Sequence, residues 1–237
     1  MSAGRPTDVD RYLSRLIPRG GRIGPHADGW GVAYFEGRAS RIFKDASPAA
    51  ESRYLAILAK ARLKSTAVVA HIRKANPAIV GRATANTHPF EREWNGRSWV
   101  FAHNGKLPGI QDQADGRGGR FKPLGDTDSE QAFCLLLNAM AQEIDCGDEV
   151  SPRSIQSALM PVVDMLSRLG EFNFILSNGE YTIVHAHTRL HVLEKSPDAA
   201  ARGNPVALLA TAPLTGENWR PLSPGSTCVY KEGRLAG

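Results

Sequence analysis

Apolar residues recur at helical spacing in four segments of the chain, and a polar capping residue precedes each segment. The expected caps are Asp8, Ser47, Thr127 and Ser151. Thr127 is followed three residues later by Glu130, which is the spacing of a capping box. The apolar stripe of the second helix is expected to comprise Tyr54, Ile57, Leu58 and Ala61. The four predicted helices cover residues 8–17, 47–61, 127–140 and 151–169.

Other segments are apolar throughout or rich in β-branched and aromatic residues, which predicts β-strands. Asn178-Gly179 lies between two such segments and is a strong hairpin signal. Residues 106–126 are rich in glycine and show no periodicity, so a long loop is expected there. The predicted strands cover residues 30–35, 40–43, 66–72, 99–102, 172–177, 181–186, 190–194, 206–212 and 227–231.

The predicted strands occur in hairpin-like groups, with the helices gathered between them. This order indicates an α+β layered fold built from antiparallel sheets, rather than a doubly wound parallel sheet. No internal repeat or linker divides the 237 residues, so a single domain spanning residues 1–237 is expected.

Composition argues against several classes of protein. The formal net charge is +5 and the pI is about 9.3, but the basic residues are scattered apart from one cluster at residues 117–120. A nucleic-acid-binding face needs a basic patch or stripe, so no nucleic-acid partner is expected. Three widely spaced cysteines do not make a disulfide framework. No apolar run reaches about 18 residues and the N-terminus is polar, so no membrane segment or signal peptide is expected, and the predicted location is the cytoplasm.

Asn104-Gly105 directly follows a predicted strand and could stabilise an oxyanion. The side-chain N–H of Asn104 and the backbone N–H of Gly105 can point at one oxygen atom. The same dipeptide is also a favoured turn sequence, and the spacing alone does not separate the two interpretations.

Three other residues are candidates for binding a small molecule. Arg73 ends the predicted strand 66–72, where its guanidinium could bind a carboxylate through two parallel hydrogen bonds. Asp128 lies in the first turn of a predicted helix, where its carboxylate could accept hydrogen bonds from an ammonium group. A surface arginine and an acid favoured by the helix dipole are the structural alternatives. His88 could line a pocket, but a loop histidine before proline is also common as a structural residue.

The sequence does not indicate a metal site or a cofactor. His185 and His187 share one face of a predicted strand with His191 nearby, but no carboxylate has matching spacing. The glycine-rich residues 20–31 lack the lysine of a phosphate-binding loop and the dinucleotide pattern.

Taken together, several short motifs resemble those of the class II glutamine amidotransferases, which are of the N-terminal-nucleophile type. The resemblance is closest to the small stand-alone subgroup that has no synthase domain, and it covers essentially the whole chain. It implies a four-layer αββα sandwich of two mostly antiparallel sheets. The matching motifs are Pro6-Thr7-Asp8, residues 24–31, Phe43-Lys44-Asp45, residues 69–73, 86–90, 102–105 and 127–133, and residues 212–216.

The resemblance also implies roles for individual residues. Arg73 would hold the α-carboxylate of glutamine, and Asp128 would hold its α-amino group. The oxyanion would be stabilised by Asn104 and Gly105. Two further residues would lie around the pocket, namely His88 and Asp28.

In that family, an N-terminal cysteine exposed by removal of methionine attacks the γ-carbonyl carbon, with its own α-amino group as the base. A γ-glutamyl thioester forms, ammonia or an amine leaves, and water hydrolyses the thioester. The expected partner is therefore a small-molecule substrate, glutamine or another γ-glutamyl compound. Because the chain has no synthase domain, any transfer of ammonia would need a separate acceptor enzyme.

The start of the chain departs from the family pattern. Members of the subgroup open with Met-Cys and a few apolar residues, whereas this chain begins at the Met-Ser-Ala stretch that comes after them, about six residues later, the length of a typical strand. The nucleophile and the first strand are therefore expected to be missing. Three explanations stay open: a start that is assigned too late or truncated, a pseudoenzyme that binds glutamine-like ligands without cleaving them, and Ser2 as a hydroxyl nucleophile.

Overall fold

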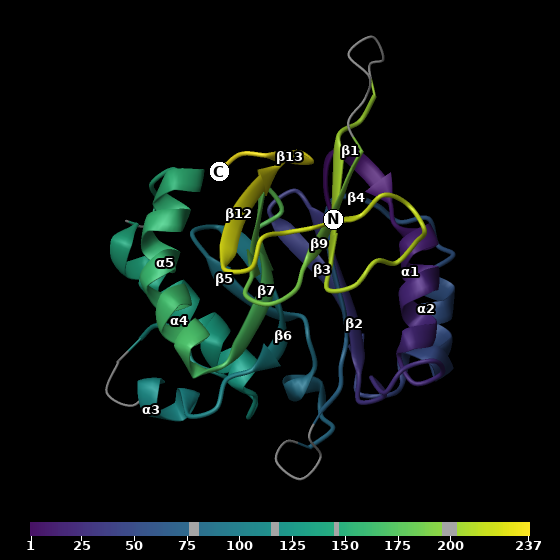
Figure 1. Ribbon diagram of the computed structural model, residues 1–237, viewed down its shortest axis with the longest axis horizontal. Helices are drawn as coiled ribbons and strands as arrows, with labels where there is room; N and C mark the ends of the chain where they lie inside the picture. Colours follow the sequence, from purple (N-terminus) through teal and green to yellow (C-terminus); the bar gives the residue numbers. More distant parts are fainter. Residues whose placement is uncertain (76–80, 115–118, 145–146, 196–202) are drawn as a thin grey trace.

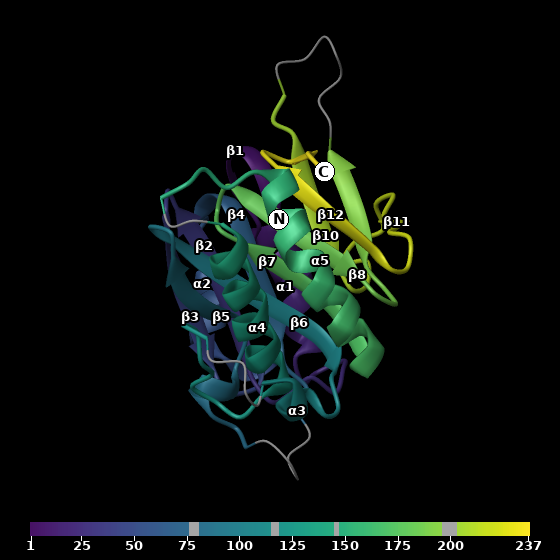
Figure 2. The same cartoon turned by 90° about the vertical axis from the view of Figure 1, so that its left-hand side faces the viewer.

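The computed structural model describes residues 1–75, 81–114, 119–144, 147–195 and 203–237 (Figure 1). Two antiparallel sheets pack face to face, and helices cover the outer face of each (Figures 1 and 2). This is the α+β sandwich that the order of strands and helices predicts, arranged in the four layers that the family resemblance implies.

The first sheet has seven strands in the order β11-β9-β10-β1-β4-β2-β3. Every neighbouring pair is antiparallel. The predicted hairpin of β2 and β3 is confirmed. The strands are β1 (Ser2–Asp8), β2 (Trp30–Glu36), β3 (Ala39–Asp45), β4 (Lys64–Ile72), β9 (His191–Lys195), β10 (Val206–Ala210) and β11 (Arg220–Pro221).

The second sheet has six strands in the order β13-β12-β8-β7-β6-β5. The hairpin expected at Asn178-Gly179 joins β7 to β8 and is confirmed. Small and β-branched side chains such as Val69 and Val100 fill the space between the two sheets. The strands are β5 (Phe90–Trp94), β6 (Arg97–Lys106), β7 (Glu171–Ser177), β8 (Tyr181–Ala186), β12 (Ser226–Lys231) and β13 (Arg234–Leu235).

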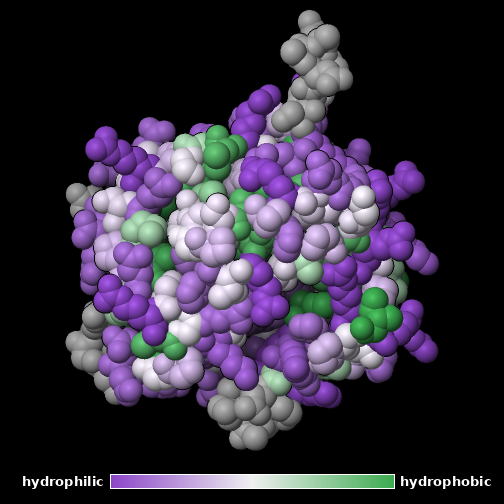
Figure 3. Space-filling view, viewed as in Figure 1, coloured by the Kyte–Doolittle hydropathy of each residue, from purple (hydrophilic) through white to green (hydrophobic). Residues whose placement is uncertain are grey.

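The outer helices bury one face each against the sheets. Helices α4 (Asp128–Glu143) and α5 (Pro152–Leu169) pack on the six-stranded sheet through a large apolar core. Helices α1 (Asp10–Leu16) and α2 (Arg53–Leu58) cover the seven-stranded sheet. The face seen in Figure 3 is largely hydrophilic, with only small separate apolar patches, as is normal for the surface of a folded protein.

Two predicted helix starts are wrong. Asp8 is the last residue of β1, and α1 begins after Val9 without a side-chain cap. The cap of α2 is Ser52, whose Oγ accepts a hydrogen bond from the backbone N–H of Leu55 at 3.2 Å. With this later start, a different face of the helix packs against the sheet. The predicted stripe residues Tyr54 and Ile57 are therefore 77% and 69% exposed. Of the predicted stripe only Leu58 is buried, and Leu55 is the other buried residue of the helix.

The third predicted helix starts where expected, with a different role for Glu130. Thr127 caps α4 by accepting a hydrogen bond from the N–H of Glu130 at 3.1 Å. The Glu130 carboxylate does not complete a capping box, because it pairs with Arg92 at 2.6 Å and accepts from the N–H of Gly125. The long loop predicted at residues 106–126 contains a short helix, α3 (Ile110–Ala114). Part of this loop, and Arg117 of the basic cluster, lie outside the described residues.

The expectation that the first strand is missing needs correction. Residues Ser2–Asp8 form a strand of their own, β1, in the middle of the seven-stranded sheet. Its pairing is incomplete, however, because it meets β10 through only two residue pairs, Ser2 with Ala207 and Ala3 with Val206. A cavity lies beyond this short contact.

Candidate active site

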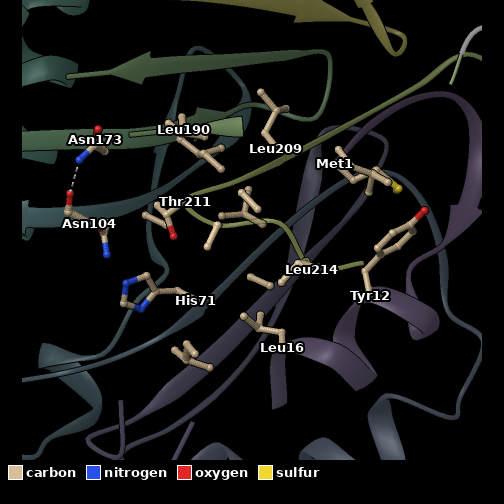
Figure 4. A pocket seen from close by; sticks show the side chains of 18 of the residues that line it. Met1, Tyr12, Leu16, His71, Asn104, Asn173, Leu190, Leu209, Thr211 and Leu214 are labelled. Atoms are coloured by element: carbon tan, nitrogen blue, oxygen red, sulfur yellow. Dashed lines mark hydrogen bonds between the residues drawn. The ribbon is translucent and has the colours of Figure 1, made fainter. Parts of the chain in front are cut away.

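A cavity of about 310 Å³ opens between β4 and β10, next to the start of β1 (Figure 4). Its walls come from α1, β4, β6, β7 and the segment that follows β10. Met1 lies towards one end, and Asn104 and His71 lie towards the other. The cavity therefore extends from the helix layer through the sheet to the space between the two sheets.

The backbone around this cavity has the arrangement that an additional strand requires. Met1 and Val68 form a hydrogen-bonded pair, with N···O distances of 2.8 and 3.1 Å. Beyond this pair, no described strand lies between β4 and β10. Antiparallel strands bond to a given neighbour at alternate residues, so Ala70 and Ile72 direct their N–H and C=O groups into the cavity. A segment continuing β1 could bond to both neighbouring strands.

Three histidines are grouped at the inner end of the cavity: His71 and His103 line it, and His88 lies behind His71. His88 and His103 are buried, and His71 is partly exposed. The rings of His71 and His88 are stacked, with centroids 4.2 Å apart. Burial lowers the pKa of His71 to about 3 and lowers the pKa of His88 well below its usual range, and the charge of Arg73 adds to both effects. Neither ring nitrogen of His88 has a hydrogen-bond partner among the described residues. The rings are therefore neutral near pH 7 and provide polar atoms without charge.

Arg73 follows β4 directly and is held by its backbone. Its N–H donates to the carbonyl oxygen of Gly29 at 2.7 Å, and its own carbonyl accepts from Asp28. The guanidinium is buried, and Nη1 lies 3.3 Å from the carbonyl oxygen of Asp28. No carboxylate of the described residues forms an ion pair with it, so the charge is available to an anionic ligand group.

The carboxylate of Asp28 is already engaged. One oxygen pairs with Arg82 at 2.9 Å, and the other accepts from the N–H of Ala75 at 2.9 Å. Burial by itself would raise the pKa of Asp28, but these hydrogen bonds outweigh it and the pKa is lowered. Asp28 thus fixes the segment after Arg73.

Asn104 and Gly105 lie inside β6, so the turn interpretation of this dipeptide is wrong. Both pair with β7, where their partners are Asn173 and Phe172. The Asn104 side chain lines the cavity, and the backbone carbonyl oxygen of Asn104 accepts from Nδ2 of Asn173 at 3.1 Å (Figure 4). A Cβ atom on residue 105 would collide with the carbonyl oxygen of Glu171, so only glycine fits this position.

Hydrogen bonds connect Asp128, at the start of α4, to β6 beside Asn104, and they run through Ser129 and His103. Its Oδ2 accepts from the N–H of Leu107 at 2.8 Å, and its Oδ1 accepts from the N–H of Ser129 at 2.7 Å. The Ser129 hydroxyl lies 2.9 Å from Nδ1 of His103, the residue before Asn104. The N-terminus of α4 is thereby connected to β6.

The expected site residues differ in how directly they meet the cavity. Asn104 is among the described residues that line it, whereas Gly105, Arg73, Asp28, His88 and Asp128 are not. Gly105 and Arg73 each follow a lining residue directly, and His88 stacks on the lining residue His71.

Sequence reasoning missed two residues that support this region, Asn173 and Ser129. Asn173 is buried and its Oδ1 accepts from the N–H groups of Thr188 and Arg189. An asparagine within the apolar residues 172–176 was a visible signal, since a buried amide needs hydrogen-bond partners. Ser129 gave no signal, because serine is common in the first turn of a helix.

The described cysteines lie away from the cavity. Cys134 is on the buried face of α4, and burial raises its pKa to about 11. Burial also raises the pKa of Cys228, on β12. Both thiols are therefore poor nucleophiles at neutral pH. Cys146 lies outside the described residues.

The described residues also contain no cluster of three or more histidine, cysteine, aspartate or glutamate side chains suited to a metal ion. Among the helices described, none is long and apolar enough to span a membrane.

Known proteins resemble the chain over its full length. The family model of the class-II glutamine amidotransferases matches residues 1–237. An Escherichia coli (strain K12) protein named "Putative glutamine amidotransferase YafJ" is 38% identical over 248 residues, covering 97% of this chain and 95% of that protein. The crystal structure of a predicted glutamine amidotransferase from Pseudomonas aeruginosa PA01 has a TM-score of 0.75 at 32% identity, covering 100% of this chain and 97% of that one. Glutamine phosphoribosylpyrophosphate amidotransferase from B. subtilis, at 18% identity and a TM-score of 0.65, covers 95% of this chain and 44% of its own and shares the fold.

Proposed function

The chain belongs to the class II glutamine amidotransferases, and we propose that it acts on the amide of glutamine or another γ-glutamyl compound through an N-terminal cysteine thioester. The observation that carries this proposal is the cavity between β4 and β10, because it leads from the start of β1 to Asn104. A segment continuing β1 would run along this path and deliver its first residue to the candidate site.

Each candidate site residue would then bind a different group of the substrate. Arg73 holds the α-carboxylate, since its buried guanidinium forms no ion pair with a described carboxylate. Asp128 accepts hydrogen bonds from the α-ammonium group, and two backbone N–H groups orient its carboxylate for this task. The Asn104 side chain and the Gly105 N–H stabilise the oxyanion of the tetrahedral intermediate.

The register of β1 fixes where a nucleophile would lie. Ser2 pairs with Ala67 in β4, and the same register carried backwards puts the fifth position before Met1 opposite Arg73. Paired residues of antiparallel strands point to the same side of a sheet, and Met1 packs with Val68 on the helix side. Alternation then turns the side chain at the fifth position towards the other sheet, which carries Asn104.

The reaction follows from a cysteine at that position. The α-amine takes the thiol proton, and the sulfur attacks the γ-carbonyl carbon. The C–N bond breaks as the amine returns the proton to the leaving nitrogen, so ammonia or an amine departs and a γ-glutamyl thioester remains. Water then hydrolyses the thioester. Transfer of the ammonia would need a separate acceptor enzyme, and the cytoplasm is the proposed location.

The test compares the 237-residue chain with a variant that carries Met-Cys and four apolar residues before Met1. After removal of the initiator methionine, the extended variant should release ammonia from glutamine, whereas the same extension with alanine in place of cysteine should not. Asn104→Ala in the extended variant should lower turnover by about 10²–10³-fold, the range for one lost oxyanion donor. An extended variant that folds, binds glutamine and releases no ammonia would contradict the proposed reaction.

The alternative is a pseudoenzyme that binds a glutamine-like ligand without cleaving it. It is supported by the positions of Cys134 and Cys228, neither of which lines the cavity. It predicts glutamine binding by both the 237-residue chain and the extended variant, with no ammonia from either. Calorimetric titration with glutamine beside the ammonia assay separates the two functions.

A further inference from the structure

We propose that Ser129 and His103 are positioning residues that fix Asp128 relative to Asn104, so that recognition of the α-amino group beside the oxyanion site depends on one buried hydrogen-bonded link. This inference deepens the proposed function and rests on it. The link joins the first turn of α4 to β6 within the described structure.

The surroundings of His103 determine which ring nitrogen carries the proton. Alternation along β6 turns His103 towards α4, while Asn104 faces the cavity. His103 is buried, and Nε2 lies 3.0 Å from the carbonyl oxygen of Glu171. A carbonyl oxygen only accepts, so Nε2 carries the proton. In the neutral ring Nδ1 is then an acceptor, and the Ser129 hydroxyl donates to it at 2.9 Å.

Ser129 also contacts Asp128, through its backbone. The Ser129 hydroxyl oxygen also lies 3.2 Å from Oδ1 of Asp128, but its single proton goes to the nearer Nδ1 of His103, which has no proton of its own. The N–H of Ser129 is therefore the main donor to Oδ1 of Asp128, at 2.7 Å. With the N–H of Leu107 on the other oxygen, the carboxylate uses two of about four acceptor sites, and the others can receive an ammonium group. The hydroxyl thus anchors the residue that orients the carboxylate.

The imidazole of His103 also supports the proposed oxyanion site. A Cβ atom on residue 105 would lie 2.8 Å from Nε2 of His103, so the ring is packed directly against Gly105. One side chain therefore contacts both the strand that carries the N–H donors and the helix that carries Asp128. Removal of the Ser129 hydroxyl should release the helix end and leave the strand in place.

The test is Ser129→Ala in the 237-residue chain, with glutamine and 4-carbamoylbutanoate as the two ligands. The second ligand keeps the carboxylate and the amide but lacks the α-amino group. Calorimetry should show that S129A weakens glutamine binding about tenfold, as expected for a misplaced hydrogen bond to a charged group. Binding of 4-carbamoylbutanoate should stay within about twofold, by the same reasoning.

The chain offers a matched control in Ser167 on α5. Its hydroxyl lies 3.3 Å from Nε2 of His185, so Ser167→Ala removes a second serine–histidine pair, one that does not involve Asp128 or Asn104. S167A should change the affinity for neither ligand, and Ser129→Thr, which keeps a hydroxyl, should bind glutamine like the unmodified chain. Equal weakening of both ligands by S129A, or no weakening, would overturn the inference.

A second readout does not depend on ligand binding. In ¹⁵N spectra, His103 should be the neutral tautomer with the proton on Nε2, and S129A but not S167A should shift its Nδ1 signal. If the unmodified chain binds neither ligand, the proposed function of the site fails while this measurement still tests the link. A His103 ring protonated on Nδ1, or an Nδ1 signal that S129A does not shift, would contradict the proposed link between Ser129 and His103.

Discussion

Several histidines have a lower pKa in the folded protein than in the unfolded chain. Burial lowers the pKa of His71 to about 3 and that of His185 to about 4, and it also lowers the pKa values of His88 and His103. In the unfolded chain, these groups titrate near the ordinary histidine value of about 6.5. At a pH between the folded and the unfolded pKa of such a histidine, the unfolded state binds more protons than the folded state. Lowering the pH therefore favours unfolding.

The free energy of unfolding should therefore decrease as the pH falls from 7 to 5. Each histidine that stays neutral in the folded state contributes up to about 1.4 kcal/mol per pH unit below its unfolded pKa. Carboxylates whose pKa is lowered in the folded protein, such as Asp28, lose their contribution mainly at lower pH. Urea unfolding at pH 7, 6 and 5 measures the slope, and His71→Phe should reduce it. A free energy of unfolding that does not change over this range would contradict the burial of these rings.

Single residues could be predicted from the sequence where their position in an element was clear. Arg73 and Asn104 were found as candidates because each stands at the end of an apolar run. The sequence could not show that β6 continues through Asn104 to Lys106, because that depends on pairing with β7, which is remote in the chain. Ser129 was missed for a similar reason, since its partner His103 lies 26 residues away.

Two helices of the same layer start with similar caps and differ in the first residue after the cap. Thr127 accepts from the N–H of Glu130, and Ser151 accepts from the N–H of Ser154, each at 3.1 Å. The first helical residue of α4 is Asp128, whereas α5 begins with Pro152, away from the site. The two caps therefore allow stability and ligand binding to be separated.

Thr127→Ala and Ser151→Ala should each lower the free energy of unfolding by about 1 kcal/mol. Only Thr127→Ala should also weaken glutamine binding, because fraying of the first turn displaces Asp128. Urea unfolding and calorimetric titration on the same two variants provide the measurements. Similar loss of glutamine affinity in both variants would count against the role of Asp128.

At the scale of elements, the sequence predicted strands such as β4 and β7 to within two residues at each end, because most of the residues in them are apolar. It failed for the start of α2, where Ser47 and Ser52 are both acceptable caps. Residues 49–51 instead form a short 3₁₀ turn, and the N–H of Ala50 bonds to the carbonyl of Gly20 at 3.0 Å. A contact with another part of the chain thus decided between two locally similar starts.

For the whole molecule, hairpin grouping predicted the α+β class, and the family resemblance implied the four layers. Neither indicated that residues 2–8 are themselves a strand. Ser2 and Ala3 are buried, but the five residues that follow in β1 are partly or fully exposed, so the sequence carries almost no apolar signal there. The position of β1 is set by its neighbours β4 and β10 rather than by its own sequence.

The short pairing of β1 has a consequence for the internal dynamics of the protein. Amide protons at the centre of a sheet are ordinarily among the slowest to exchange with solvent, and those at its rim are faster. Here the N–H groups of Ala70 and Ile72 face the cavity, although β4 has four strands on one side and two on the other in the sheet order. Hydrogen–deuterium exchange should find these two amides faster than their neighbours Val69 and His71, which face β2. The fastest exchange within this part of β4 would then lie in the middle of the sheet, and a chain extended through the cavity should slow the exchange of both amides.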